Sequence, residues 1–101
     1  MLKGYWIVRL DVTDPDVFTR YAAATPAVLG KYGARFLARG GNHESVEGTP
    51  RSRNAVIEFP SYEAALACYR SAEYQALREV RRSAAVIDLE IVQGYDGSQP
   101  S

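Results

Sequence analysis

The chain has 101 residues, a formal net charge of zero, and a composition that is 47% hydrophobic and 24% charged. These values are typical of one globular domain with a modest core, and they exclude a disordered chain. Because no net positive charge is available to attract phosphate groups, we expect neither a nucleic-acid partner nor binding to an anionic membrane.

The chain contains one cysteine, Cys68, and one histidine, His43. A single cysteine excludes an internal disulfide, and its alanine-rich surroundings indicate a buried small hydrophobe rather than a reactive thiol. The two residues match no zinc-ligand spacing, so we expect no metal and no cofactor. There is no signal-peptide pattern, and no apolar run approaches the roughly 20 residues of a membrane helix. We therefore expect a cytoplasmic protein of bacterial type.

The first expected element is a strand at residues 4–12, where hydrophobic side chains recur with period two. A helix should follow, because Asp14 can cap it and Pro15 suits its first position. Pro26 lies inside the helical pattern and lacks the amide proton that the helix needs, so it should kink the helix or split it. Gly33 should end the helix.

Two further strands are expected at residues 34–39 and 53–59, joined by the loop RGGNHESVEG. This loop is either a catalytic segment or a reversal between two strands. We favour the reversal, because the paired glycines can adopt the backbone angles that a turn from one strand to the next requires. His43, at the tip of the loop, is the weakest catalytic candidate, since solvated loops carry polar residues for solubility alone.

A second helical pattern covers residues 61–84, with cap signals at Ser61 and again at Ser71. It predicts one helix with a jog or two short helices in tandem. The last strand should span residues 86–93. We expect residues 1–95 to form the single domain and residues 96–101 to be a frayed tail.

The predicted order βαββαβ is that of the ferredoxin-like α+β fold: a four-stranded antiparallel sheet with helices on one face. The apolar face should lie under the helices. It comprises Trp6, Val8, Leu10, Phe36, Ala38, Ala55, Ile57, Phe59, Ile87, Leu89 and Ile91. The opposite face mixes apolar groups with charges of both signs. It comprises Tyr5, Ile7, Arg9, Arg35, Leu37, Arg39, Val56, Glu58, Asp88, Glu90 and Val92.

This mixed face has two interpretations. A second copy of the chain could cover it, with the charges pairing or lining a cavity between two sheets. Alternatively, it is a solvated face whose charges pair across strands. We favour the covered face, because its apolar side chains would otherwise be exposed together. RNA-recognition modules share this strand order, but Val56 and Glu58 offer neither a stacking ring nor a positive charge.

Several segments together resemble the bacterial DUF1330 family of unknown function. They are GYWIVRLDVTDPDVFTRY, YGARFLARGG, the EG pair at Glu47, RSRNAVIEFPSYEAALACYRSAEYQ, and the arginine pair before a last strand that ends in Gly94. They cover nearly the whole chain, and SxEYQ is the most specific of them. Ala72 departs from the family, which usually has proline after this serine.

The resemblance implies a ferredoxin-like subunit that pairs sheet to sheet with a second copy as a dimeric α/β-barrel. The wider superfamily includes cofactor-independent monooxygenases, isomerases and dehydratases, haem proteins, and proteins with no known chemistry. The fold alone therefore does not assign a function.

Six side chains should converge near one end of the sheet and form our candidate ligand-binding site. They are Arg39, Glu47, Arg53, Tyr69, Tyr74 and Arg81. Arginines would hold a carboxylate or enolate by paired hydrogen bonds, and a tyrosine or Glu47 could move a proton. The structural alternative is that Arg39, Glu47 and Arg53 form ion pairs across the hairpin while the tyrosines pack in the core or the interface.

Two functional hypotheses follow. The first is a homodimer that binds a small organic acid or aromatic compound in a polar pocket between sheet and helices, or converts it as a cofactor-independent enzyme of the monooxygenase or isomerase type. The second is a non-catalytic dimeric domain whose charged sheet face serves only assembly. The sequence identifies neither the ligand nor a reaction.

Overall fold

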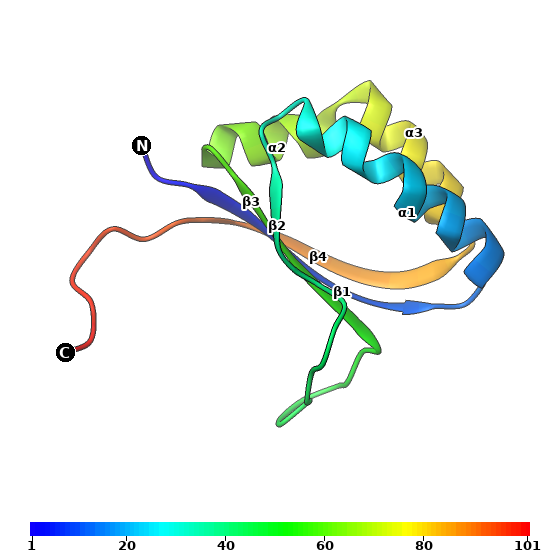
Figure 1. The fold of residues 1–101 in the computed structure, drawn as a ribbon, viewed down its shortest axis with the longest axis horizontal. Helices are drawn as coiled ribbons and strands as arrows, with labels where there is room; N and C mark the ends of the chain where they lie inside the picture. Colours follow the sequence, from blue (N-terminus) through cyan, green and yellow to red (C-terminus); the bar gives the residue numbers. More distant parts are fainter.

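The computed structural model describes residues 1–101 and consists of one sheet with helices on one side (Figure 1). The strands are β1 (Gly4–Val12), β2 (Arg35–Arg39), β3 (Arg53–Phe59) and β4 (Ala85–Gln93). The helices are α1 (Pro15–Gly30), α2 (Tyr62–Arg70) and α3 (Ala72–Arg81). The strands are antiparallel in the order β2-β3-β1-β4. The expected ferredoxin-like α+β fold is confirmed, and its second helical region is a tandem pair.

The helix boundaries follow from side-chain caps. The Asp14 carboxylate accepts a hydrogen bond from the Val17 amide at 3.3 Å, and Pro15 occupies the first turn of α1. Pro26 lies inside α1 and does not split it. The Ser71 hydroxyl donates to the Cys68 carbonyl at 2.7 Å and accepts from the Tyr74 amide at 3.1 Å. One serine therefore ends α2 and starts α3.

The core is centred on Trp6, which β1 directs toward the helices. Its indole N–H donates to the Ala65 carbonyl of α2 at 3.0 Å. Its ring packs against Phe59, Tyr69 and Tyr74, at centroid distances of 5.2, 5.9 and 4.9 Å. Truncating a buried aromatic side chain of this size typically costs roughly 3–5 kcal/mol. Trp6 thus fixes α2 and the start of α3 against the centre of the sheet.

Strand β2 carries an irregularity that reverses part of its expected pattern. Phe36 pairs with Ile57, whereas Ala38 pairs with Val56, the next residue back along β3. Leu37 is therefore an extra residue, a β-bulge, and the alternation of side chains restarts after it.

The bulge corrects the face that we expected for two residues. Arg39 was expected on the open face and Ala38 under the helices, and both expectations are wrong. Arg39 pairs with Ala55, whose partner on β1 is the core residue Val8. Arg39 therefore lies on the helix side of the sheet and Ala38 on the open side.

No helix or loop of the chain covers the centre of the other sheet face, which combines ion pairs with exposed apolar groups. Arg35 contacts Glu58 at 3.2 Å, and the Glu58 carboxylate also accepts from the Tyr5 hydroxyl at 3.4 Å. Val86 is 50% exposed and Val92 is 45% exposed.

The loop of residues 40–52 extends away from the helices (Figure 1). Its second half is tied to the open face, because Arg51 pairs with Asp11 at 2.9 Å and with Asp88 at 3.1 Å. The Arg9 guanidinium donates to the Thr49 carbonyl at 2.6 Å. None of the three helices combines the length and apolar character that crossing a membrane requires.

Candidate functional site

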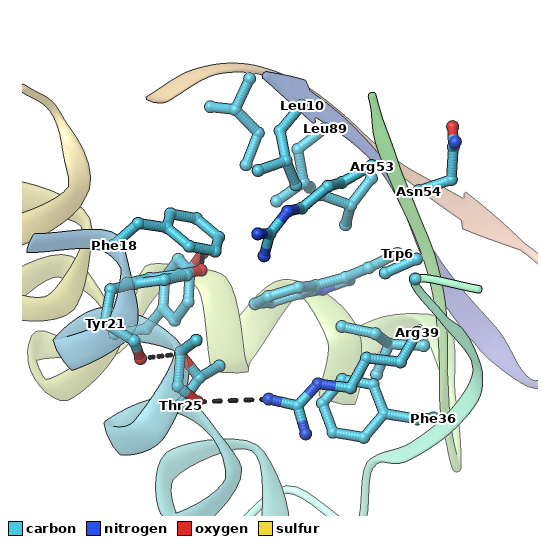
Figure 2. Close-up of a pocket in the computed structure, with 17 residues that line it drawn as sticks. Trp6, Leu10, Phe18, Tyr21, Thr25, Phe36, Arg39, Arg53, Asn54 and Leu89 are labelled. Carbon is cyan, nitrogen blue, oxygen red and sulfur yellow. Dashed lines mark hydrogen bonds between the residues drawn. The ribbon is translucent and has the colours of Figure 1, made fainter. Parts of the chain in front are cut away.

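A cavity of about 330 Å³ lies between the sheet and α1 (Figure 2). This volume is at the lower end of the range for small-molecule sites. Aromatic and aliphatic side chains make up most of the wall. The lining residues are Trp6, Val8, Leu10, Phe18, Tyr21, Ala22, Thr25, Phe36, Arg39, Gly40, Arg53, Asn54, Ala55, Ile57, Tyr74, Ile87 and Leu89.

Two arginines mark the mouth of the cavity. Arg39, Gly40 and Arg53 are its exposed lining residues, so it opens where β2 ends and β3 begins. Arg39 pairs with Ala55, two residues from Arg53, which makes the two arginines diagonal neighbours on one sheet face. Neither arginine forms an ion pair with a carboxylate. The mouth therefore carries two positive charges that no acidic side chain neutralises.

Arg39 is held by a carbonyl that Pro26 leaves without a partner. In an α-helix the amide of residue 26 would donate to the Ala22 carbonyl, but proline has no amide proton. The Arg39 guanidinium donates to this carbonyl at 3.2 Å instead and lies 4.3 Å from the centroid of the Phe36 ring. The helix-breaking residue thus creates the acceptor that draws Arg39 across the cavity mouth (Figure 2).

Arg53 has fewer contacts. Its guanidinium carbon lies 5.4 Å from the centroid of the Phe18 ring on α1. No side-chain hydrogen bond restrains it, so its donors are free to bind a ligand.

A hydroxyl pair backed by a buried arginine forms the inner polar wall. The Tyr21 and Tyr74 oxygens are 2.6 Å apart, and Arg81 donates to the Tyr74 oxygen at 3.5 Å. Tyr74 and Arg81 are two helical turns apart on α3, which places them on the same helix face. Arg81 is only 4% exposed and has no carboxylate partner, and its Nε donor is unsatisfied.

Burial shifts the ionisation of this cluster. Desolvation is the main reason that the Tyr74 pKa lies above its ordinary value, and the neighbouring Tyr21 adds to the shift. Burial opposes the charge of Arg81, but the oxygens of Tyr74 and Tyr21 outweigh it and raise the Arg81 pKa above its ordinary value. At neutral pH Arg81 is therefore a cation beside the protonated hydroxyl of Tyr74.

Cys68 takes no part in the site. It is fully buried in α2, as its surroundings predicted, and burial raises the pKa of its thiol to about 12. A thiol that stays protonated at neutral pH is a poor nucleophile. No three histidine, cysteine, aspartate or glutamate side chains of the chain come together as a metal-binding group.

The structure brings together only part of the expected site. Arg39, Arg53 and Tyr74 line the cavity, and Arg81 lies directly behind Tyr74. Tyr69 does not line it, because its ring packs against Trp6 in the core.

Glu47 also fails to converge with the arginines. It lies in the exposed loop of residues 40–52 and forms no ion pair, so the expected ion-pair lock on the hairpin is absent as well. His43 is exposed in the same loop, and its Nδ1 lies 3.3 Å from the Gly41 carbonyl oxygen. Gly40 and Gly41 have positive φ angles of 66° and 85°, which supports their expected role in the reversal.

Sequence reasoning missed the contribution of α1. Tyr21 was not among the six candidate residues, although a phenol in the helical pattern after Asp14 brings a hydroxyl that needs a partner. Thr25 lines the cavity too, and its hydroxyl donates to the Tyr21 carbonyl at 2.6 Å. The free Ala22 carbonyl could have been predicted from the sequence, because a proline inside a helix always frees the carbonyl four residues earlier.

The chain matches one family model and resembles several solved structures. The model of DUF1330, a domain of unknown function, matches residues 3–95. No curated protein matches the chain. Among solved structures, it is similar to a protein of unknown function from Rhodopseudomonas palustris, with a TM-score of 0.77, 13% identity, and coverage of 95% of this chain and 85% of that one.

Two further structures share the fold. SnoaB, a cofactor-independent oxygenase from Streptomyces nogalater, has a TM-score of 0.64 and 13% identity, with coverage of 99% of this chain and 97% of that one. A dimeric ferredoxin-like protein of unknown function from Thermobifida fusca has a TM-score of 0.59 and 13% identity, with coverage of 91% and 89%. At such identities the similarity shows the fold alone.

The link between Pro26 and Arg39 can be tested by a double-mutant cycle. Pro26→Ala restores an amide that bonds to the Ala22 carbonyl, so it should raise the free energy of unfolding by roughly 1–3 kcal/mol. Arg39→Met should then cost less in the Pro26→Ala background than in the wild type, with a coupling of roughly 0.5–1.5 kcal/mol. Urea unfolding of the wild type, the two single variants and the double variant measures this coupling. Strictly additive changes in the free energy of unfolding would contradict a link between Pro26 and Arg39.

Stability should fall as the pH rises above about 9. The raised pKa values of Tyr74 and Cys68 mean that the native state keeps protons that the unfolded chain releases at alkaline pH. The stabilisation is complete below the ordinary values of these groups and is lost as the pH rises above them. Urea unfolding at about pH 8 and about pH 11 measures the slope. Tyr74→Phe should reduce it, whereas Tyr95→Phe, at an exposed tyrosine, should not; equal slopes in both variants would refute the assignment.

Proposed function

The chain belongs to the DUF1330 family, and we propose that it binds a small organic acid with a flat apolar body in the cavity between its sheet and α1. The observation that carries the proposal is the unneutralised pair Arg39 and Arg53 at the mouth of an otherwise apolar cavity. A guanidinium presents parallel N–H donors that match the geometry of a carboxylate. The aromatic and aliphatic wall suits the rest of such a molecule.

The size of the cavity supports a ligand of modest dimensions. Its volume of about 330 Å³ is equivalent to roughly ten waters of the bulk liquid. Releasing water from apolar walls favours binding, and the carboxylate would stay at the exposed mouth, where its desolvation cost is low. A single-ring aromatic acid combines both properties.

The neighbouring structures extend the proposal only by analogy of fold. SnoaB is described as a cofactor-independent oxygenase, and most of the other similar structures have no known function. Chemistry of the oxygenase or isomerase type thus stays a prediction for this chain, as does a cytoplasmic location. The alternative of a purely structural dimeric domain does not account for Arg39, whose side chain lies in the cavity and not on the sheet face expected to serve assembly.

We further propose that the chain forms a homodimer through its open sheet face. Tyr5, Ile7 and Val56 lie only half-buried on this face, and Val86 and Val92 are about half-exposed. A contiguous mixed surface of this kind marks an interaction site, and a twofold pairing lets the same patch serve both partners. Two of the similar structures are described as dimeric.

Ligand binding should depend on the two mouth arginines. Arg39→Gln and Arg53→Gln should each weaken binding of benzoate-type acids about tenfold or more, because each removes a charged hydrogen-bond donor. Calorimetric titration of a panel of aromatic acids measures the affinities, with the matching uncharged amides as ligand controls. Arg20→Gln, at an exposed arginine of α1 outside the cavity, should have no effect. Amides that bind as tightly as the acids would overturn the proposal.

Self-association should depend on the open face. The wild type should have twice the mass of one chain in sedimentation analysis at micromolar concentration, and Ile7→Lys should be monomeric, because it places a charge at the centre of the face. Val80→Lys, on an exposed apolar residue of α3, should remain dimeric. Circular dichroism checks that the variants are folded. A monomeric wild type, or a dimeric Ile7→Lys protein, would rule out this interface.

A further inference from the structure

The buried cation of Arg81 has no anion in the chain to balance it. Its side chain is 4% exposed, its hydrogen-bond partner is the neutral Tyr74 hydroxyl, and its Nε donor has none. Its guanidinium carbon lies 5.6 Å from the centroid of the Tyr21 ring and 6.0 Å from that of the Tyr74 ring. Burying a charge without a counterion is costly in a folded protein. The arrangement therefore favours an anionic group arriving from outside the chain.

Counting the hydrogen-bond donors of Tyr21 and Tyr74 shows where an anionic group would bind. Arginine can only donate, so the Tyr74 oxygen accepts from Arg81. The Tyr21 and Tyr74 hydroxyls hold two protons, and their mutual bond of 2.6 Å uses one. Neither hydroxyl has another acceptor within the chain, and both residues line the cavity. One donor therefore remains for a ligand.

Burial favours Tyr21 as the residue that presents this donor. Tyr74 is 0% exposed and Tyr21 is 9% exposed, so we assign the proton of their mutual bond to Tyr74, the more deeply buried of the two. The chain of donation then runs from Arg81 to Tyr74 to Tyr21 and into the cavity. Successive hydrogen bonds polarise one another, which strengthens the last donor. Figure 2 shows Tyr21 on α1 opposite Arg53 and Arg39 of the sheet.

We propose that the Tyr21 hydroxyl, supported by Tyr74 and Arg81, binds an ionised oxygen of the ligand, so that the substrate class is an aromatic or unsaturated acid with a phenol or enol group away from its carboxylate. The inference rests on the proposed function, which places the carboxylate at Arg39 and Arg53. On binding, the O–H bond of the phenol or enol breaks, its electron pair stays on oxygen, and its proton goes to solvent. The resulting oxyanion accepts the Tyr21 proton in a hydrogen bond and supplies the negative charge that Arg81 lacks.

This assignment gives the site a chemical capability beyond binding. Donors that are positioned in advance around a developing oxyanion stabilise it most in a site shielded from water. A phenolate or enolate is far richer in electrons at its ring or α-carbon than the neutral compound. The site would therefore prepare such a carbon for attack on an electrophile. Tyr21 contacts the reacting oxygen, whereas Tyr74 and Arg81 act through it as positioning residues.

The experiment uses 4-hydroxy-3-nitrobenzoate, whose phenolate absorbs visible light when the phenol ionises. With the probe saturated by wild-type protein, the midpoint of the absorbance change against pH should lie at least one pH unit below that of the free probe. This shift equals an at least tenfold preference for the phenolate over the phenol. Tyr21→Phe should remove most of the shift, whereas the matched variant Tyr32→Phe, outside the cavity, should retain it.

The outcomes separate this inference from the proposed function. If 4-hydroxy-3-nitrobenzoate and 3-nitrobenzoate both fail to bind, the proposed function itself fails. If both bind with an affinity that depends on Arg39 and Arg53, but the bound phenol titrates alike in the wild type and in Tyr21→Phe, the proposed function stands and the oxyanion assignment is wrong. Folding of Tyr21→Phe is checked independently by circular dichroism and urea unfolding, which should show a folded protein with a cooperative transition.

Discussion

The packing of Trp6 holds the sheet and the helices that enclose the cavity in place relative to one another. The indole comes from the central strand β1, donates to a carbonyl of α2, and contacts the Tyr74 ring of α3. Tyr74 then reaches α1 through the hydroxyl of Tyr21. One side chain thus connects the sheet to all three helices, directly or through one neighbour. Because the same indole also forms part of the cavity wall, the cavity cannot change shape without disturbing the core.

The sheet serves two surfaces at once. On its helix side it forms the floor of the cavity, and on the other side it carries half-buried apolar residues among ion pairs. Alternate residues of the same strands supply the two surfaces, as Val8 and Ile7 of β1 illustrate. The cavity opens at the ends of β2 and β3 and not through the open face. Binding of the proposed ligand and the proposed pairing with a second chain would therefore not obstruct each other.

Much of this architecture could be predicted from the sequence, because its determinants are periodic or local. Strands, helices and the two faces of β1 and β4 follow from hydrophobic repeats, and Ser71 was identified as a cap from its neighbours. The face of Arg39 could not be predicted in this way. A bulge depends on the pairing of β2 with β3, and RFLAR by itself reads as a regular strand.

The site was harder to predict than the fold, because it depends on distances between elements. Tyr21 and Tyr74 are 53 residues apart in the chain, and no spacing rule links them. Glu47 was placed near the arginines from its position in the hairpin, but the loop extends away from the helices and carries it out of reach of the cavity. The bulge that misled the assignment of Arg39 is also what brings it into the site.

The bond between Arg39 and the Ala22 carbonyl would also reduce the entropy lost when the proposed ligand binds. A long arginine side chain on a protein surface ordinarily loses considerable rotational freedom when it grips an anion. Here folding has already imposed most of that loss. The guanidinium packs on the Phe36 ring and donates to the Ala22 carbonyl, which has no helical partner because residue 26 is proline. The resting contact is a single hydrogen bond to a neutral acceptor, which a carboxylate can replace with a stronger one. Pro26 would thus preorganise Arg39 for the proposed ligand and lower the entropic cost of binding it.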